Sequence, residues 1–117
     1  MENVVIGYIG CPIRHVISRF GDKWSMLVLY ELNQSKEGKL RYSELSKKML
    51  DCSQKMLSAT LRNLEENGLV RRTVHNTMPI QVDYSLTEVG QSLMPHINGL
   101  IDWARQNMSY FKEKPLK

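Results

Sequence analysis

Hydrogen-bonding and cationic side chains recur at helical spacing between residues 53 and 62, which suits them to an anionic or polar partner. On a helix they lie opposite Leu57, Leu61 and Leu64, which stack on one face. The first turn contains a lysine and no acid, although the helix dipole is positive there, so an external anion such as a phosphate can bind. The pattern also fits an ordinary surface helix with solvated polar groups. The polar residues are Ser53, Gln54, Lys55, Ser58 and Arg62.

Cys11 and His15 are the other residues whose types and spacing could do chemistry, because they stand four residues apart on one predicted helix. Two ligands do not make a metal site, and neither His75 nor His96 has a neighbour at ligand spacing. The sequence also contains no glycine-rich phosphate loop, nucleophile elbow or HExxH motif. It therefore predicts no catalytic residue, no metal ion, no cofactor and no enzyme activity.

The positive charge of the chain is concentrated around the polar helix. Residues 38–72 contain eight basic and four acidic side chains, whereas residues 1–37 and 73–117 contain four of each. The middle segment therefore carries the whole net charge of +4. Localised positive charge is the electrostatic footprint of a nucleic-acid-binding surface, although it also occurs on solvated faces.

Length and composition predict one soluble domain. At 117 residues, with 42% hydrophobic and 24% charged residues, the chain is large enough for one core and too small for two. The apolar residues at positions 4–9 are interrupted by Gly7, lack a preceding basic region and are too few to span a membrane. Two cysteines do not make a disulfide scaffold. We therefore expect a cytoplasmic protein without a signal peptide or membrane partner.

The polar helix must be positioned by the elements that precede it. A first helix is predicted to begin at Pro12, which needs no hydrogen-bond donor there, and to stop at Gly21. Asp22 is expected to cap a second helix over residues 23–33, which is apolar nearly all round and should be the buried centre of the domain. Trp24 is expected to be a core anchor.

A short third helix completes the unit that presents the polar helix. After a polar loop and an extended piece at 40–42, Ser43 is expected to cap this third helix. A tight turn then leads into the polar helix, which Ser53 caps and Gly68 ends. Two short helices joined in this way predict a helix-turn-helix, whose second helix enters the DNA major groove in DNA-binding examples.

After the polar helix, the apolar period changes from that of a helix to that of a strand. Alternation over residues 70–75 and 81–86 predicts a hairpin with its tip at 76–80. A two-stranded ribbon directly after a helix-turn-helix is the layout of a winged helix. Arg71 and Arg72 and the polar tip are placed to reach the phosphate backbone or the minor groove.

Thr87 is expected to cap a last helical segment whose apolar stripe continues to Phe111. Pro95 and Gly99 should kink it. The stripe is longer than one small domain needs to cover itself, which favours burial against a second chain over folding back on the same core. The predicted fold class is mainly α with a small β-hairpin (α+β), a winged helix-turn-helix with extra N- and C-terminal dimerisation helices.

Several of these segments resemble a known family. The matching motifs are Cys11-Pro12, Gly21-Asp22-Lys23-Trp24, Arg41-Tyr42-Ser43-Glu44-Leu45, LRNLEENGLV at 61–70 and YSLTEVG at 84–90. In this order, from residue 11 to about residue 103, the chain resembles the HxlR-type transcriptional regulators of the MarR-like group. The CP…GDKW start together with the YSLTEVG close is the most specific part of the resemblance.

The resemblance implies a single winged-helix domain over 1–117, with the helix-turn-helix at about 43–67, the wing at about 70–87 and C-terminal dimerisation helices at about 88–112. It implies a homodimer, paired through its first and last helices, that binds a pseudo-palindromic site in double-stranded DNA and controls nearby genes as repressor or activator. The candidate DNA-binding residues are Arg41, Ser43, Ser53, Gln54, Lys55, Ser58, Arg62, Arg71, Arg72 and His75.

Two residues depart from the family pattern. Gln54 stands where many relatives have proline, and Gln81, after the wing tip, stands where relatives often have Lys or Arg. The second departure weakens the case for a phosphate contact at position 81. It shifts that contact to Arg71, Arg72 and His75.

Some members of the family sense oxidants, quinones or aldehydes through a cysteine just before the first helix, and Cys11 matches that position. A thiol at a helix N-terminus can have a lowered pKa and a more reactive thiolate, but a small buried residue at a dimer interface also fits. Cys52 is expected to be a bystander. A metal-responsive regulator and a winged helix used only for protein contacts are the alternatives to a DNA-binding regulator.

Overall fold

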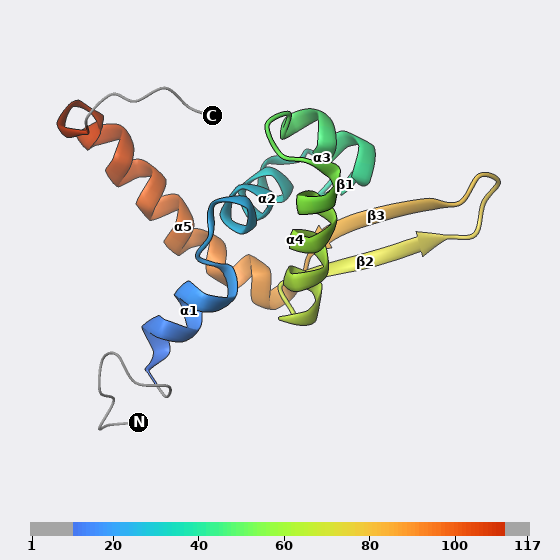
Figure 1. Ribbon diagram of the computed structural model, residues 1–117, viewed down its shortest axis with the longest axis horizontal. Helices are drawn as coiled ribbons and strands as arrows, with labels where there is room; N and C mark the ends of the chain where they lie inside the picture. The colour runs from blue at the N-terminus through green and yellow to red at the C-terminus, as the bar shows by residue number, and fades with distance from the viewer. Residues whose placement is uncertain (1–10, 112–117) are drawn as a thin grey trace.

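The computed structural model describes residues 11–111, which form a helical body with one small sheet. Figure 1 shows the β2–β3 hairpin projecting from one side of this body, while α1 and the far end of α5 project from the other. This arrangement confirms the predicted winged helix-turn-helix fold, mainly α with a small sheet. The apolar stretch at 4–9 and the ends of the expected domain lie outside the described residues. The elements are α1 (Pro12–Phe20), α2 (Lys23–Gln34), β1 (Lys39–Arg41), α3 (Tyr42–Lys48), α4 (Gln54–Glu66), β2 (Val70–His75), β3 (Gln81–Leu86), α5 (Glu88–Asn107) and a 3₁₀ turn (Met108–Tyr110).

Three predicted helix caps are confirmed. In each, the side-chain oxygen of the capping residue accepts a hydrogen bond from the backbone N–H three residues later, which satisfies one of the unpaired donors at a helix start. Gly68 adopts φ +77°, the left-handed conformation expected just beyond α4. The cap bonds are Ser25 N to Asp22 Oδ2 (3.1 Å), Met56 N to Ser53 Oγ (3.0 Å) and Gly90 N to Thr87 Oγ1 (3.0 Å).

The cap predicted at Ser43 is wrong. The N-cap of α3 is Arg41, and Ser43 lies inside the first turn of the helix. The Arg41 backbone N–H donates to the Glu44 carboxylate at 2.8 Å, so this acid in the first turn replaces the hydroxyl cap. The helix begins two residues earlier than expected because the chain leaves β1 at Arg41 and turns directly into α3.

The wing hairpin is part of a three-stranded antiparallel sheet rather than a two-stranded ribbon. The strand order is β1-β3-β2, and the three-residue strand β1 pairs with the edge of β3 that is not paired with β2. Residues that face each other across an antiparallel pair point to the same side of the sheet. Leu40, Tyr84 and Arg72 form one such row, which shares its face with the buried core. The neighbouring row, Arg41, Asp83 and Thr73, points to the opposite, outer face.

The hydrophobic core lies between α2, α4 and the inner face of the sheet. Leu57, Leu61 and Leu64 of α4 are each at most 2% exposed, which confirms the predicted inward leucine face. Helix α2 contributes further buried residues, but Leu27 on its other side is 37% exposed, so the helix is not buried all round. Trp24 packs against the core while only partly buried, and the Lys23 ammonium lies 4.3 Å from its ring centroid.

Helices α1 and α5 leave apolar side chains uncovered in the single chain. No residue of α1 is buried, and Ile13 and Ile17 are 55% and 64% exposed. The first half of α5 packs on the core through Met94 and Ile97, whereas Trp103 further along is 56% exposed.

The last helical segment is one helix followed by a single 3₁₀ turn. Helix α5 runs through both Pro95 and Gly99, so these residues do not divide it into two helices. Within residues 11–111, no helix is long and apolar enough to cross a membrane.

Candidate nucleic-acid interface

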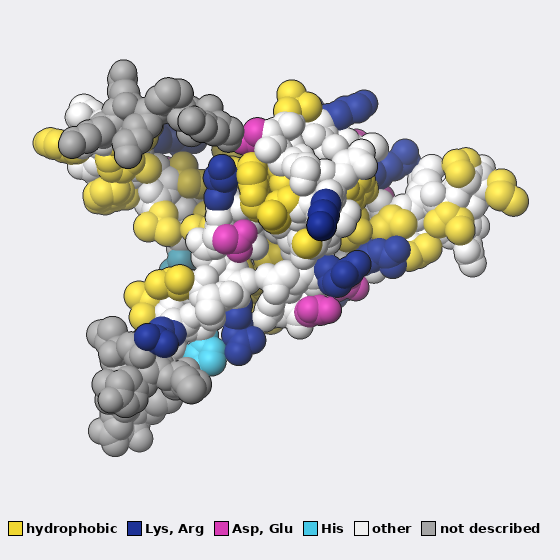
Figure 2. Space-filling model, in the orientation of Figure 1, with side chains coloured by type: hydrophobic (Ala, Val, Ile, Leu, Met, Phe, Trp, Pro, Cys, Tyr) yellow, Lys and Arg dark blue, Asp and Glu magenta, His cyan; other side chains and the backbone are white. Residues whose placement is uncertain are grey.

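Helix α4 presents its polar face to solvent because its leucine face is fixed in the core. The five predicted residues on α4 and at its cap are all exposed, so the structure brings this part of the predicted site together on one surface. Figure 2 shows Lys and Arg side chains gathered over α4 and the base of the wing on the viewed face. These five residues are Ser53, Gln54, Lys55, Ser58 and Arg62.

A polar hollow of about 400 Å³ lies between α4 and the inner face of the sheet. Ser58 and Arg62 line it from α4, and Arg72 lines it from β2. Two guanidinium groups against the single carboxylate of Glu65 give this hollow a local excess of positive charge. It is therefore suited to an anionic partner that contacts α4 and the wing base together. The complete lining is Tyr42, Ser58, Arg62, Glu65, Arg72 and Tyr84.

Tyr42 is a residue of this surface that sequence reasoning did not single out. Its hydroxyl lies 3.1 Å from the Gln54 carbonyl oxygen, to which it donates, and 3.2 Å from the Ser58 hydroxyl. These bonds tie the first residue of α3 to the first turns of α4. The tyrosine is visible within the RYSEL motif, but its partners are 12 and 16 residues away, so no local pattern indicates the contact.

The outer face of the sheet carries a second polar hollow, of about 480 Å³, whose charges are largely paired. His75 Nε2 lies 2.7 Å from Asp83 Oδ2, and Lys39 Nζ lies 3.9 Å from the same oxygen. Arg41 also lines this hollow, together with Glu37, Glu44 and Asp83. Three acids against Lys39 and Arg41 make this face a poor site for an anion.

The structure therefore divides nine of the ten predicted residues between two faces. Arg72 lies beside Arg62 on the α4 side, whereas Arg71 points to the outer face because adjacent strand residues alternate. Arg41 and His75 line the outer hollow as well. Ser43 is exposed in the first turn of α3, outside both hollows.

A family model for HxlR-like helix-turn-helix proteins matches residues 19–112. The chain belongs to the HxlR-like helix-turn-helix family. It is thus a transcriptional regulator of the helix-turn-helix type, and family membership implies DNA binding.

Named relatives agree with this assignment. An uncharacterized HTH-type transcriptional regulator of Methanothermobacter thermautotrophicus is 39% identical over 100 residues, covering 86% of this chain and 74% of that protein. The oxidized form of the redox regulator HypR has a TM-score of 0.75 and 34% identity, covering 83% of this chain and 97% of that chain. Diamide-treated YodB from Bacillus subtilis has a TM-score of 0.69 and 32% identity, covering 92% of this chain and all of that chain (100%).

The two cysteines of this HxlR-like protein have different surroundings. Cys11 occupies the N-cap position of α1 and is 2% exposed. Cys52 lies in the turn before α4, where burial and the neighbouring Asp51 carboxylate raise the pKa of its thiol and Lys23 partly opposes them. The raised pKa disfavours the reactive thiolate at Cys52. In the described part of the chain, no three His, Cys, Asp or Glu side chains are grouped to hold a metal ion.

Proposed function

We propose that this HxlR-like protein is a sequence-specific regulator that binds double-stranded DNA as a homodimer on a pseudo-palindromic site. The observation that carries the proposal is the exposed polar face of α4 beside the cationic hollow that Arg62 and Arg72 share. An α-helix fits the DNA major groove, and cations beside it are then positioned for the phosphates.

The residues of α4 take two roles in this proposal. Gln54 reads bases, because a glutamine amide can donate and accept with the same adenine edge. Lys55 and Ser58 lie on the same exposed face and supplement the readout. Arg62 and Arg72 position the protein on the phosphate backbone, and the Tyr42 hydroxyl holds the start of α4 in place.

The uncovered apolar surface supports a dimer. An apolar hollow of about 310 Å³ lies between α2 and α5. Helix α1, whose apolar stripe is also exposed, projects on the same side of the molecule as the far end of α5 (Figure 1). A second copy of the chain that covers these surfaces would bury them from water and would set the distance between the two α4 helices. Consecutive major grooves on one face of DNA are about 34 Å apart. The hollow is lined by Met26, Leu27, Tyr30, Ile97, Leu100, Ile101 and Ala104.

The whole chain forms one functional unit in this proposal. The helix-turn-helix at about 43–67 and the wing at about 70–87 contact DNA, and the segment at about 88–112 pairs the subunits. The protein acts in the cytoplasm, where its DNA lies, and needs no cofactor.

The test is binding of the purified protein to duplex fragments from the region of its own gene. We expect one fragment to be bound far more tightly than scrambled DNA of equal length, by a species whose light-scattering mass is that of a dimer. Gln54→Ala should change which single-base variants of that site are preferred. Equal, weak affinity for every fragment would contradict a specific regulator, and affinity independent of salt would favour a module that contacts only proteins.

A response to oxidants through Cys11 is the second proposed function. Its support is the position of Cys11 at the start of α1, a helix that directly contacts α4, together with the likeness to the redox regulator HypR. A helix N-terminus stabilises a thiolate, which is the form that oxidants attack. Oxidation of Cys11 would thus act on α4 through α1.

A further inference from the structure

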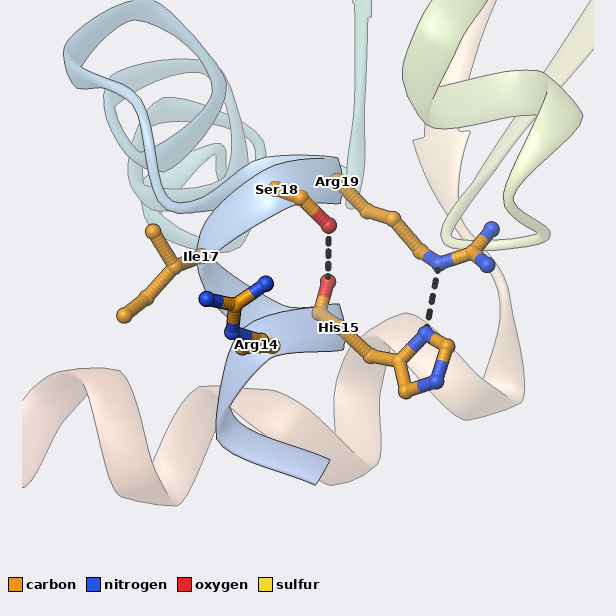
Figure 3. Close-up of a pocket in the computed structure, with 5 residues that line it drawn as sticks. All are labelled: Arg14, His15, Ile17, Ser18 and Arg19. Carbon is orange, nitrogen blue, oxygen red and sulfur yellow. Dashed lines mark hydrogen bonds between the residues drawn. The ribbon is translucent and has the colours of Figure 1, made fainter. Parts of the chain in front are cut away.

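Helix α1 has a basic face that the proposed DNA contacts do not use. Arg14, His15, Ser18 and Arg19 line an open hollow of about 510 Å³, and Ile17 of the apolar stripe borders the same hollow (Figure 3). In the close-up, Ile17 points away from the side on which His15 and Arg19 lie. The helix sequence PIRHVISRF contains no acid. No salt bridge joins Arg14 or Arg19 to another residue of the described chain.

This basic face meets α4 on the flank opposite the wing. Asn63 Nδ2 donates to the Arg19 carbonyl oxygen at 2.6 Å, and Arg19 Nη1 donates to Asn67 Oδ1 at 3.4 Å. Figure 3 shows the Arg19 guanidinium extending toward α4. Asn63 is one residue beyond Arg62, which is roughly 100° around a helix. The exposed ridge of α4 therefore has Arg72 on one side and Arg19 on the other.

A groove in duplex DNA has a phosphate strand along each side. A protein that places a helix in the major groove, about 12 Å wide, can therefore contact both strands electrostatically when cations lie on both flanks of that helix. We infer that the basic face of α1 is a second backbone clamp, which binds phosphates on the side of the groove away from the wing. The inference rests on the proposed DNA-binding function and adds α1 to the residues that carry it.

The geometry of α1 lets it serve DNA and dimer at once. His15 and Arg19 point away from Ile17, so a partner copy covering Ile13 and Ile17 leaves Arg19 open, and Arg14 lies at the border between the two sides (Figure 3). Figure 2 shows basic side chains over α1 on the same viewed face as those over α4. The Arg19 guanidinium is held in place by His15, whose Nδ1 accepts from Arg19 Nε at 3.4 Å. The clamp is therefore partly pre-organised before DNA arrives.

Arg14→Ala is the cleanest test, because Arg14 makes no hydrogen bond or ion pair within residues 11–111, so its substitution breaks none of the polar contacts between α1 and α4. Binding to the best duplex and to scrambled DNA is measured over a range of salt. Removing one phosphate interaction lowers the slope of log affinity against log salt by about 0.9. Between roughly 50 and 200 mM salt, the affinity of the variant should therefore fall about 3.5-fold less than that of wild type. The weakening should be equal on both DNAs, so the preference between them is unchanged.

Three further variants make the result decisive. Arg14→Lys should keep the wild-type slope, and Lys36→Ala, which removes an exposed charge from the loop between α2 and β1, should also keep it. Ser18→Lys adds a cation to the hollow and should steepen the slope. One outcome would overturn the clamp alone: wild type binds its site specifically, and Arg14→Ala and Ser18→Lys both remain dimers with the wild-type salt slope. In that case the clamp is wrong and the proposed function stands. If wild type shows no preference among duplexes, the proposed function itself fails.

Discussion

The Tyr42 hydroxyl lies 3.1 Å from the Gln54 carbonyl oxygen and thereby joins the start of α3 to the first turn of α4. The two halves of the helix-turn-helix are thus fixed to each other by a polar contact at the surface, beyond the leucines that fix them in the core. The contact is made to the backbone, so the Gln54 side chain remains available to a partner. In the proposed DNA complex, rigidity at this end of α4 would lower the entropy cost of placing that side chain against a base edge.

Tyr42→Phe removes this hydrogen bond without changing the packing of the ring. The hydrogen bond is exposed, so water can replace part of it, and we expect a loss of stability near the low end of about 0.5–1.5 kcal/mol. For a chain of this size, each 1 kcal/mol lowers the melting temperature by roughly 3–6 °C. Thermal melting at fixed protein concentration measures the loss. Specific DNA binding should weaken more than scrambled-DNA binding, and an equal loss on both would contradict a role in placing α4.

Arg72→Ala and Arg71→Ala should differ although the residues are adjacent. Arg72 shares the cationic hollow with Arg62, whereas Arg71 points to the outer face, where acids balance the nearby cations. We expect Arg72→Ala to lower the salt slope by about 0.9 and to weaken binding to all sequences alike. Arg71→Ala is the matched control and should change the slope less. Equal effects would show that both faces of the wing contact DNA.

Local features of the fold were predictable because they depend on neighbouring residues. The caps at Asp22, Ser53 and Thr87 each involve a side chain and a backbone N–H three residues later, which is a short-range pattern. The leucine face of α4 follows from helical period alone. Strand β1 is visible in the sequence only as an extended piece, because three residues are too few to show alternation and its partner Tyr84 is 44 residues away from Leu40.

The candidate site was predictable on α4 and less so elsewhere. A count of charges along the chain points to residues 38–72 as the basic segment. In the same count, Arg14 and Arg19 are cancelled by acids that lie outside α1, so the basic face of α1 was missed. His75 was expected to contact phosphate, but the fold places it against Asp83. Both outcomes depend on which segments pack together in the fold. Charges counted along the sequence do not show that packing.

Gly90→Ala and Gly99→Ala should change stability in opposite directions. A Cβ on Gly90 would overlap the Leu69 backbone carbonyl oxygen, which the start of α5 contacts where Thr87 N donates to it at 3.1 Å. A backbone atom cannot move aside cheaply, so we expect a loss of about 1–3 kcal/mol in urea unfolding. Gly99 has open space around its Cβ position, and alanine there should gain about 0.5–1 kcal/mol from helix propensity. Gly90→Ala as stable as wild type would contradict the close packing of α5 on the link between α4 and β2.

Comparing Cys11→Ser with Cys52→Ser should show whether an oxidant acts through Cys11 or through either thiol. The pKa of Cys52 is raised above its ordinary value, mainly by burial, so it remains a thiol at neutral pH and should be alkylated more slowly than in the unfolded chain. Because the folded state keeps this proton, stability should fall as the pH rises above the pKa of the unfolded thiol.

If Cys11 is the sensor, diamide should release wild type and Cys52→Ser from DNA but leave Cys11→Ser bound, as fluorescence anisotropy would show. Undiminished release of Cys11→Ser would leave Cys11 as a packing residue at the start of α1.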